Sequence, residues 1–429
     1  MDGREQAGAL ARPLGDASGA TRAAGTPVLV VSAAATAAPA YARTPAPPRT
    51  YAPAAPRALA PPPMLPPPPP PAPAPSAPVR TAAPKTKTAH PAARIEPAQM
   101  VCWQVSVVAV LACLDRPWPV LTAVSIGAAV VLALTAIRVD GRWLYQLAGL
   151  ACRFTLRGRR HDLPDSPAKA EALIGLLLPG SAVGTLETAQ GATPAISHAH
   201  GLTAMVCPEK AVDPRAFPSP ADLLPPATDD DPEFVVQAAF HAGTRPDAPP
   251  RLWLGVHAVR TADVPGDPEL ELALRNAVRR IRRALNRAGI TAGPPAEDTA
   301  FAALTALAHV TGGRNELRED WRFWRTGPVS QACFTLDGWA GLADPVVTAL
   351  TVRLLTPVAG VAVTLTLAAR TGGRRSAVLR LAATTEAAVD VTAARLTQLL
   401  TPAGIRLSRL DGGHFLAVAA SLPIGGFPR

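Results

Sequence analysis

Two apolar runs lie close together in the chain, at residues 99–114 and 120–137. Only Asp115, Arg116 and a Pro-Trp-Pro tripeptide separate them. One continuous helix over both runs would be about 60 Å long, roughly twice the thickness of the hydrocarbon core of a bilayer. It would also place both charges near the bilayer centre, at a cost of about 3 kcal/mol each. The pattern therefore predicts two antiparallel helices that turn at the charged, proline-rich link.

Neither run has a polar face, and this bears on the environment of the predicted pair. One interpretation is a helical hairpin buried in a soluble core, but such a helix normally keeps a polar side. The other is a transmembrane hairpin at 99–138, and it is the one we favour. Basic residues are frequent on both flanks, at 80–94 and 138–160. Because basic flanks remain in the cytoplasm, we expect a multi-pass protein of the inner (cytoplasmic) membrane with both termini cytoplasmic.

The segment 139–161 follows the second run directly and has a helical period. Apolar Trp143, Leu147, Leu150 and Phe154 recur every three or four residues, and the segment ends in Arg-Gly-Arg-Arg. This pattern predicts an amphipathic, basic juxtamembrane helix whose arginines reach anionic lipid headgroups. The alternative is an ordinary core helix of the domain that follows.

Residues 162–429 show alternating strand and helix patterns, which predict a cytoplasmic α/β domain with a mixed sheet. Strands are predicted at 202–207, 252–260, 331–336 and 377–382, and helices at 269–287, from 298 onward and at 385–400. Turn sequences with Gly predict two further strand hairpins, 347–355 with 361–370 and 405–410 with 414–420.

Residues 1–98 differ from the rest of the chain in composition. They are rich in Ala and Pro, and no acidic residue occurs between 21 and 95. Such sequence buries too little apolar surface to offset the entropy of ordering, so we expect a disordered basic arm with local polyproline II structure. The arm acts either as a spacer or as a ligand for a proline-binding groove. Beside a membrane, its charge favours anionic headgroups or an acidic partner.

Little in the chain indicates catalysis or a cofactor. The five Cys are scattered, which argues against a disulfide framework or a zinc site. His198 and His200 resemble a pair of metal ligands, but only Cys207 lies near them in the sequence. The sequence contains no phosphate-binding loop, dinucleotide fingerprint or nucleophile elbow. We therefore expect no metal, no other cofactor and no catalytic residues.

A cluster at 316–328 places two Trp and one Phe among alternating charges. Aromatic rings with arginines are typical of protein interfaces, and a helical turn at 321–324 would put both Trp on one face. The alternative is that the rings fill the domain's own core. The predicted interface residues are Trp143, Tyr145, Trp321, Arg322, Trp324 and Arg325.

The predicted helix at 269–287 carries six arginines, from Arg275 to Arg287. No aromatic or polar base-reading side chains are interleaved with them, as a nucleic-acid surface would require. We therefore expect no nucleic-acid partner and interpret the basic face as solvated or partner-facing.

Three sequence segments, taken in order, resemble EccE, the membrane component of actinobacterial type VII secretion systems. They are the exit sequence RVDGRWLY at 138–145, the cluster DWRFWRTG at 320–327 and the terminal GIRLSRLDG at 404–412. The resemblance covers roughly 99–423, and the long Pro-rich arm and the Pro-rich stretch at 208–231 depart from it. It implies a non-catalytic subunit beside EccB, the EccC ATPase and EccD. It also implies a cytoplasmic domain loosely similar to glycosyltransferases but without their active site.

An enzymatic interpretation stays open as the alternative. It is a membrane-tethered, glycosyltransferase-like enzyme at the cytoplasmic face, with His257, Asp337 and the acidic run Asp229–Asp231 as candidate residues. The run lies in loop-like sequence beside a proline, where a solvated acidic segment is the simpler interpretation.

Overall fold

The computed structural model describes residues 97–139, 142–165, 168–188, 191–226, 232–245, 247–356 and 358–426. The arm predicted at 1–98 lies outside the described residues, except for 97 and 98. These two residues begin the first helix.

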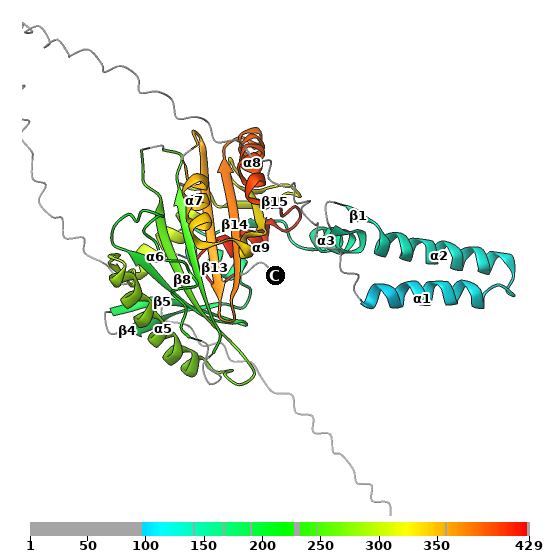
Figure 1. The fold of residues 1–429 in the computed structure, drawn as a ribbon, viewed down its shortest axis with the longest axis horizontal. Helices are drawn as coiled ribbons and strands as arrows, with labels where there is room; N and C mark the ends of the chain where they lie inside the picture. The colour runs from blue at the N-terminus through cyan, green and yellow to red at the C-terminus, as the bar shows by residue number, and fades with distance from the viewer. Residues whose placement is uncertain are drawn as a thin grey trace, which may run out of the picture. The chain divides into compact units, whose positions relative to one another are not determined.

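Two antiparallel helices form the hairpin that the apolar runs predict (Figure 1). They are α1 (Pro97–Ala112) and α2 (Trp118–Ala136), and Pro117 precedes the first turn of α2. Thr135 joins them: its hydroxyl accepts a 2.8 Å hydrogen bond from the indole N–H of Trp103, and its carbonyl accepts one from Gln99. Among the described helices, only α2 is long and apolar enough to cross a membrane, and α1 is shorter.

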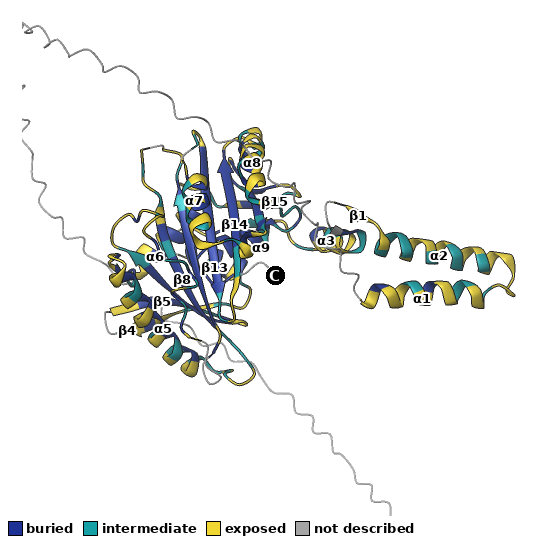
Figure 2. Ribbon diagram, viewed as in Figure 1, coloured by how far each residue is buried: buried dark blue, intermediate teal, exposed yellow. Residues whose placement is uncertain are grey.

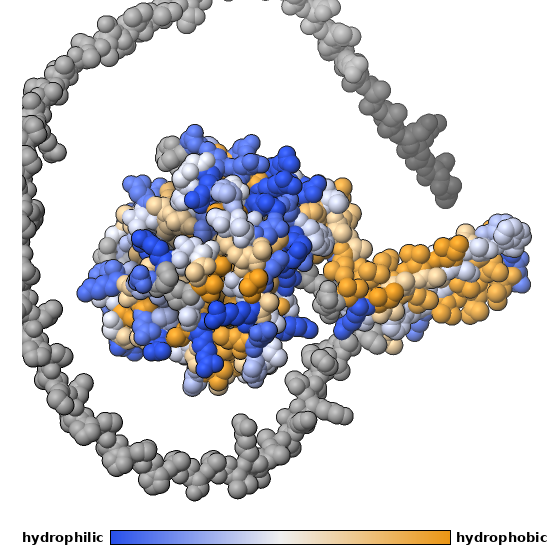
Figure 3. Space-filling view, turned by 90° about the horizontal axis from the view of Figure 1, so that it is seen from above, coloured by the Kyte–Doolittle hydropathy of each residue, from blue (hydrophilic) through white to orange (hydrophobic). Residues whose placement is uncertain are grey.

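The hairpin carries its apolar side chains on the outside. Most of the exposed large apolar residues of the described chain lie between Met100 and Val139. Figure 2 shows this region mostly exposed, and Figure 3 shows it as a largely hydrophobic rod. No residue of α2 is buried.

A short connection links the hairpin to the sheet. Strands β1 (Arg138–Val139) and β2 (Arg142–Trp143) pair antiparallel, and α3 (Leu144–Leu156) follows. The amphipathic helix predicted at 139–161 is therefore shorter than expected and is flanked by strands on both sides.

A large sheet forms the centre of the remaining chain. Its thirteen strands follow the order β3-β10-β11-β12-β14-β13-β7-β8-β6-β5-β4, with β15 beside β12 and β9 beside β6. Every pairing in the described residues is antiparallel, so the prediction of a mixed sheet is wrong. The strands are β3 (Arg160–Asp162), β4 (Ala182–Thr188), β5 (Gly191–His198), β6 (Gly201–Pro208), β7 (Phe234–Ala242), β8 (Arg251–Val259), β9 (Ala292–Gly293), β10 (Glu316–Glu319), β11 (Trp324–Thr326), β12 (Val329–Asp337), β13 (Val361–Arg370), β14 (Arg374–Ala383) and β15 (Arg406–Arg409).

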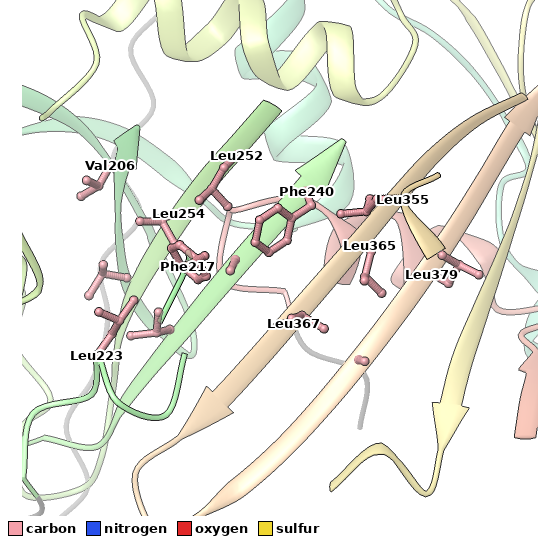
Figure 4. Packing of buried hydrophobic residues seen from close by; sticks show 14 of the residues in the cluster. Val206, Phe217, Leu223, Phe240, Leu252, Leu254, Leu355, Leu365, Leu367 and Leu379 are labelled. Atoms are coloured by element: carbon pink, nitrogen blue, oxygen red, sulfur yellow. The ribbon is translucent and has the colours of Figure 1, made fainter. Parts of the chain in front are cut away.

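Helices cover both faces of this sheet, and each set encloses its own apolar cluster. The larger cluster joins the sheet to α5 (Asp267–Arg287), α7 (Asp344–Leu354) and α8 (Glu386–Leu400). Phe217, Phe240 and Leu254 lie within it (Figure 4). The smaller cluster joins the other face to α4 (Lys169–Leu177), α6 (Glu297–Leu307) and α9 (His414–Ser421). Short 3-10 turns occur at Trp339–Gly341 and Thr401–Ala403.

Two predicted strands are helices in the structure. The run predicted at 347–355 is α7, which begins at Asp344 with a proline in its first turn. The run predicted at 414–420 is α9, which is buried almost all round beneath the sheet. For α9, burial on several sides removes the polar positions that reveal a helical period. For α7, which buries only one face, the several β-branched residues of the run resemble a strand in sequence.

Candidate functional site

The connection from α2 to α3 is organised around Trp143. The guanidinium of Arg138 lies 3.8 Å from the centre of the Trp143 ring, a cation–π contact. The backbone N–H of Trp143 donates to the side chain of Gln146 at 3.2 Å, which caps α3. Of the two predicted interface residues here, Trp143 is buried and Tyr145 is half-buried. Trp143 therefore stabilises the chain's own turn.

The carboxyl end of α3 packs onto the sheet domain through an aromatic contact and an ion pair. The ring of Phe154 meets Trp321 edge-to-face at 5.2 Å. Arg157, just beyond α3, contacts Glu319 at 2.5 Å and donates to the carbonyl of Gly412 at 2.8 Å. We call these five residues the α3 joint. They come from three segments distant in sequence, so the joint ties α3 to the sheet.

Glu319 is the buried member of the joint, with only 3% of its surface exposed. Burial raises the pKa of its carboxyl, although the backbone N–H of Phe415 and the Arg157 guanidinium act in the opposite direction. A buried carboxylate is costly unless it is paired and hydrogen-bonded. The hydrogen bond from Phe415 and the charge of Arg157 together favour the ionised form of Glu319 at this position.

Gly412 makes the close approach within the joint possible. Its φ is +68°, and a Cβ built there would lie 2.6 Å from Cζ3 of Trp321. Its backbone N–H also donates to the carbonyl of Trp321 at 2.7 Å. Any larger residue would force the indole away and strain the backbone.

The two predicted arginines of the cluster bind another helix of the same chain. Arg322 donates to both carboxylate oxygens of Asp390, at 3.1 and 3.2 Å. Arg325 pairs with Glu386 and donates to Asp320 at 2.6 Å. Because Glu386 and Asp390 lie one turn apart on α8, the two arginines hold this helix against the cluster.

The two tryptophans of the cluster do not share a face. The segment is a strand hairpin, β10 to β11, in place of a helical turn. Trp324 is 1% exposed and meets Phe415 in the core at 5.6 Å, whereas Trp321 is 36% exposed and faces α3. Trp324 therefore contributes no outer surface, while Trp321 and Arg322 do.

The structure does not bring the candidate enzymatic residues together. His257 on β8 is buried and stacks on His198 at 5.1 Å. Asp337 on β12 pairs with Arg406 and Ser408 instead. The two strands are four positions apart in the sheet, or roughly 19 Å. The acidic run Asp229–Asp231 lies outside the described residues.

The histidine pair also has a structural environment. Burial lowers the pKa of His198 to about 4 and that of His257 to about 3. A Cβ at Gly425 would lie 2.8 Å from Nδ1 of His257, so the chain's last described turn covers both rings. Within the described residues, no group of three or more His, Cys, Asp or Glu is placed to hold a metal ion.

Comparison with known proteins adds no assignment: no family model matches this chain, and no curated protein matches it significantly.

The sequence indicates Trp321 as an interface residue but does not indicate the other four residues of the joint. Phe154 belongs to the predicted stripe of the juxtamembrane helix, and Arg157 belongs to its predicted basic end. Glu319 and Gly412 carry weak signals, an acid within alternating charges and a glycine in an Asp-Gly-Gly turn. Only the packing of α3 shows that they belong together.

Proposed function

We propose that this chain is a non-catalytic structural subunit of the inner-membrane complex of a type VII (ESX-like) protein secretion system. The apolar hairpin anchors it with both termini in the cytoplasm. Its sheet domain, loosely similar to glycosyltransferase folds, contacts neighbouring subunits there, namely EccB, the EccC ATPase and EccD. The family resemblance of the exit, cluster and terminal segments supports the choice of system.

The observation that carries the proposal is a hairpin with an apolar outer surface, joined to a folded domain by a specific contact. At 1.5 Å per residue the 19 residues of α2 extend about 28 Å, close to the hydrocarbon thickness of a bilayer. Asp115 and Arg116 lie at the turn between the helices, and Arg138 lies at the other end of α2. Charges at the ends and none within α2 suit a membrane span.

The α3 joint gives the anchor a mechanical role in this proposal. A flexible tether would leave the domain free to rotate, whereas Phe154 and Arg157 fix the end of α3 to Trp321 and Glu319. A subunit whose task is to hold neighbours in register needs this kind of fixed connection. Trp321 and Arg322 stay accessible beside it and are our candidates for contact with a neighbouring subunit.

Membrane anchoring is tested by Val130→Arg, in the middle of α2. Val130 is 52% exposed, and an arginine near the bilayer centre costs about 3 kcal/mol. We expect this variant to shift from the membrane pellet to the alkaline-carbonate supernatant. The matched control is Leu272→Arg on α5, which is also exposed and should leave the chain in the pellet. Wild-type protein in the supernatant would refute the anchor.

Subunit assembly is tested by purifying the tagged full chain in a mild non-ionic detergent from its native host. We expect an ATPase subunit to co-purify, and Arg322→Ala to reduce its yield. Arg353→Ala, an exposed arginine on α7, is the control and should not. If the wild-type chain is recovered without the other subunits, the secretion assignment is wrong even though the anchor stands.

A further inference from the structure

Helix α5 carries a strong positive charge on the side that faces away from the sheet. Its inner side buries six residues, from Leu270 to Leu285. Its outer side exposes Arg279, Arg280, Arg283 and Arg287. These positions follow the three- and four-residue spacing of one helical face and extend about 12 Å along the axis.

These four arginines form no ion pair with another described residue. The acids of α5 pair elsewhere, Asp267 with Arg260 and Glu271 with Arg275. Elsewhere in the sheet domain several arginines have a carboxylate partner, including Arg322, Arg325, Arg370, Arg375 and Arg409. Like charges one turn apart on a helix repel, so this row is unfavourable until an anion neutralises it.

The charged face borders a hollow of about 770 Å³, within the size range of ligand sites. Four arginines and two amides, Asn276 and Asn286, provide its polar lining. Its apolar lining comes from Ala273 and Ala277 of α5, from Pro225 and from Phe234. The hollow therefore offers guanidinium and amide donors along one wall and a small apolar floor.

The geometry points to a groove that binds a carboxylate-rich peptide segment of a partner protein. Arginine forks bind carboxylates through two parallel hydrogen bonds, and a peptide with acids every second or third residue would meet successive arginines. This inference goes beyond the proposed function, because it assigns a binding surface and the chemistry of its occupant to a helix outside the α3 joint.

Two other anionic occupants fit less well. Single-stranded nucleic acid is bound by aromatic stacking, but Phe234, the only ring among the described lining residues, is 4% exposed. If the hairpin is the anchor, the groove lies on another part of the sheet: Arg157, just beyond α3, contacts Glu319 on β10, whereas α5 packs on β6. These strands are seven positions apart, roughly 34 Å along the sheet, so the groove is separated from the point where the anchor joins the domain.

The test measures binding by the full chain in a non-ionic detergent. The probe is a short fluorescein-labelled peptide of alternating Glu and Ala, followed by fluorescence anisotropy. We expect saturable binding that weakens with salt, and Arg280→Gln with Arg283→Gln should reduce the affinity by about tenfold or more. A peptide with Gln in place of Glu should not bind.

The matched control removes the same charge from other helices. Arg353→Gln with Arg395→Gln changes two exposed arginines on α7 and α8 that form no ion pair with a described residue. This control should keep the wild-type affinity within about twofold. Equal losses in both double variants would mean that the peptide senses only net charge, and the groove would be ruled out.

Further arms separate the possible occupants. If oligothymidine binds more tightly than the peptide, the occupant of the groove is a nucleic acid and the peptide proposal is wrong. If vesicles containing phosphatidylglycerol bind and the arginine substitutions abolish that binding, the occupant is a lipid surface.

The chain's own acidic run, Asp229–Asp231, is a second source of carboxylates. If Asp229→Asn, Asp230→Asn and Asp231→Asn together tighten peptide binding by about tenfold, the occupant is the chain itself and the partner is ruled out. Unchanged affinity supports a partner.

Discussion

Helices α2 and α5 have similar lengths, 19 and 21 residues, but they place their apolar side chains in opposite ways. Helix α5 keeps one apolar stripe and buries it completely against the sheet, with Leu270, Leu274 and Ile281 at 0% exposure. Helix α2 is apolar on all sides and buries none of its residues. The sheet gives α5 its apolar environment, whereas α2 depends on surroundings other than its own chain.

This difference teaches that burial within the chain and hydrophobicity are separate properties. In the sheet domain, exposed large apolar residues are isolated exceptions such as Leu272 and Val391. In the hairpin they are the rule, and contiguous apolar surface of that size marks an interaction site with lipid or protein. The α3 joint lies between these two regions, the apolar hairpin and the sheet domain.

The largest expected effect comes from placing the same charge in both helices. Leu274→Asp buries a carboxylate without a partner, and we expect it to destabilise the sheet domain by about 4 kcal/mol or more. Ile126→Asp, at a 61% exposed position of α2, should change that stability by less than about 0.5 kcal/mol while releasing the chain from membranes. Urea unfolding in detergent and carbonate extraction measure the two effects. Equal unfolding midpoints for both variants would contradict the claim that only α5 is buried by its own chain.

Acid should weaken the sheet domain and leave the hairpin unaffected. Burial holds the pKa of His198 at about 4, below the value near 6.5 in the unfolded chain. The unfolded state therefore binds more protons between these values. The contribution is fully present above about pH 6.5 and is lost as pH falls towards 4, amounting to about 3 kcal/mol.

This pH dependence is measured by urea unfolding between about pH 7.5 and 4.5. The hairpin, 97–139, contains no histidine, so membrane retention should stay constant over this range. His198→Gln removes the titrating ring, together with its stacking on His257 and the hydrogen bond that its Nδ1 accepts from the backbone N–H of His200. This variant should make the pH profile less steep, and the remaining slope comes from other buried histidines such as His241 and His257. A profile identical to the wild type would contradict our account.

A smaller effect is expected at the joint between the two regions. Arg157→Ala leaves the buried Glu319 without its cation and should cost about 2 kcal/mol, less than a fully buried pair because Arg157 is partly exposed. Glu319→Gln in the same chain should recover most of this loss, and the double-mutant cycle measures the coupling. Arg153→Ala, one turn earlier on α3 and exposed, is the control. Additive losses would show that the ion pair is not coupled.

The smallest effect concerns the contact between α1 and α2. Thr135→Val removes the hydroxyl that accepts from Trp103 and keeps the shape of the side chain. Side-chain hydrogen bonds between membrane helices average about 0.6 kcal/mol, so we expect a loss of that order. Thr122→Val, whose hydroxyl bonds only within α2, should cost less. Thermal unfolding in detergent, followed by the helical circular-dichroism signal, compares the two variants. An equal loss of stability in both would show that the Thr135 hydroxyl does not stabilise the contact between the helices.

Local sequence patterns predicted two kinds of element correctly. One kind has an apolar side and a polar side, as α5 does, and the other is apolar on all sides, as α2 is. The two apolar helices and their turn were predicted because prolines and charges interrupt the runs at one place. Helix α5 was predicted because its stripe and its arginines alternate with a clear period, and it begins at Asp267 with a proline in its first turn. Strand β8 was predicted at nearly its observed bounds. Each of these signals is contained in a short stretch of sequence.

The candidate site depended on contacts that no short stretch contains. Trp321 and Trp324 are three residues apart in one cluster, yet one contacts α3 and the other fills the core, because β10 and β11 form a strand hairpin. The tertiary packing buries Glu319 and so raises its pKa, and it brings up the backbone N–H of Phe415 and the Arg157 guanidinium, which act in the opposite direction. Sequence spacing predicts such partners only inside one element.

The sequence by itself therefore determined an apolar hairpin, a basic helix and the presence of a sheet, since periodicity and helix-breaking residues act locally. Only the tertiary structure decided the strand order, the helical state of α7 and α9 and the buried position of Arg380. That arginine donates to Gln331 and to the carbonyl of Leu307, and burial lowers its pKa to about 10. Its partners lie up to 73 residues away, and long-range packing alone brings them together.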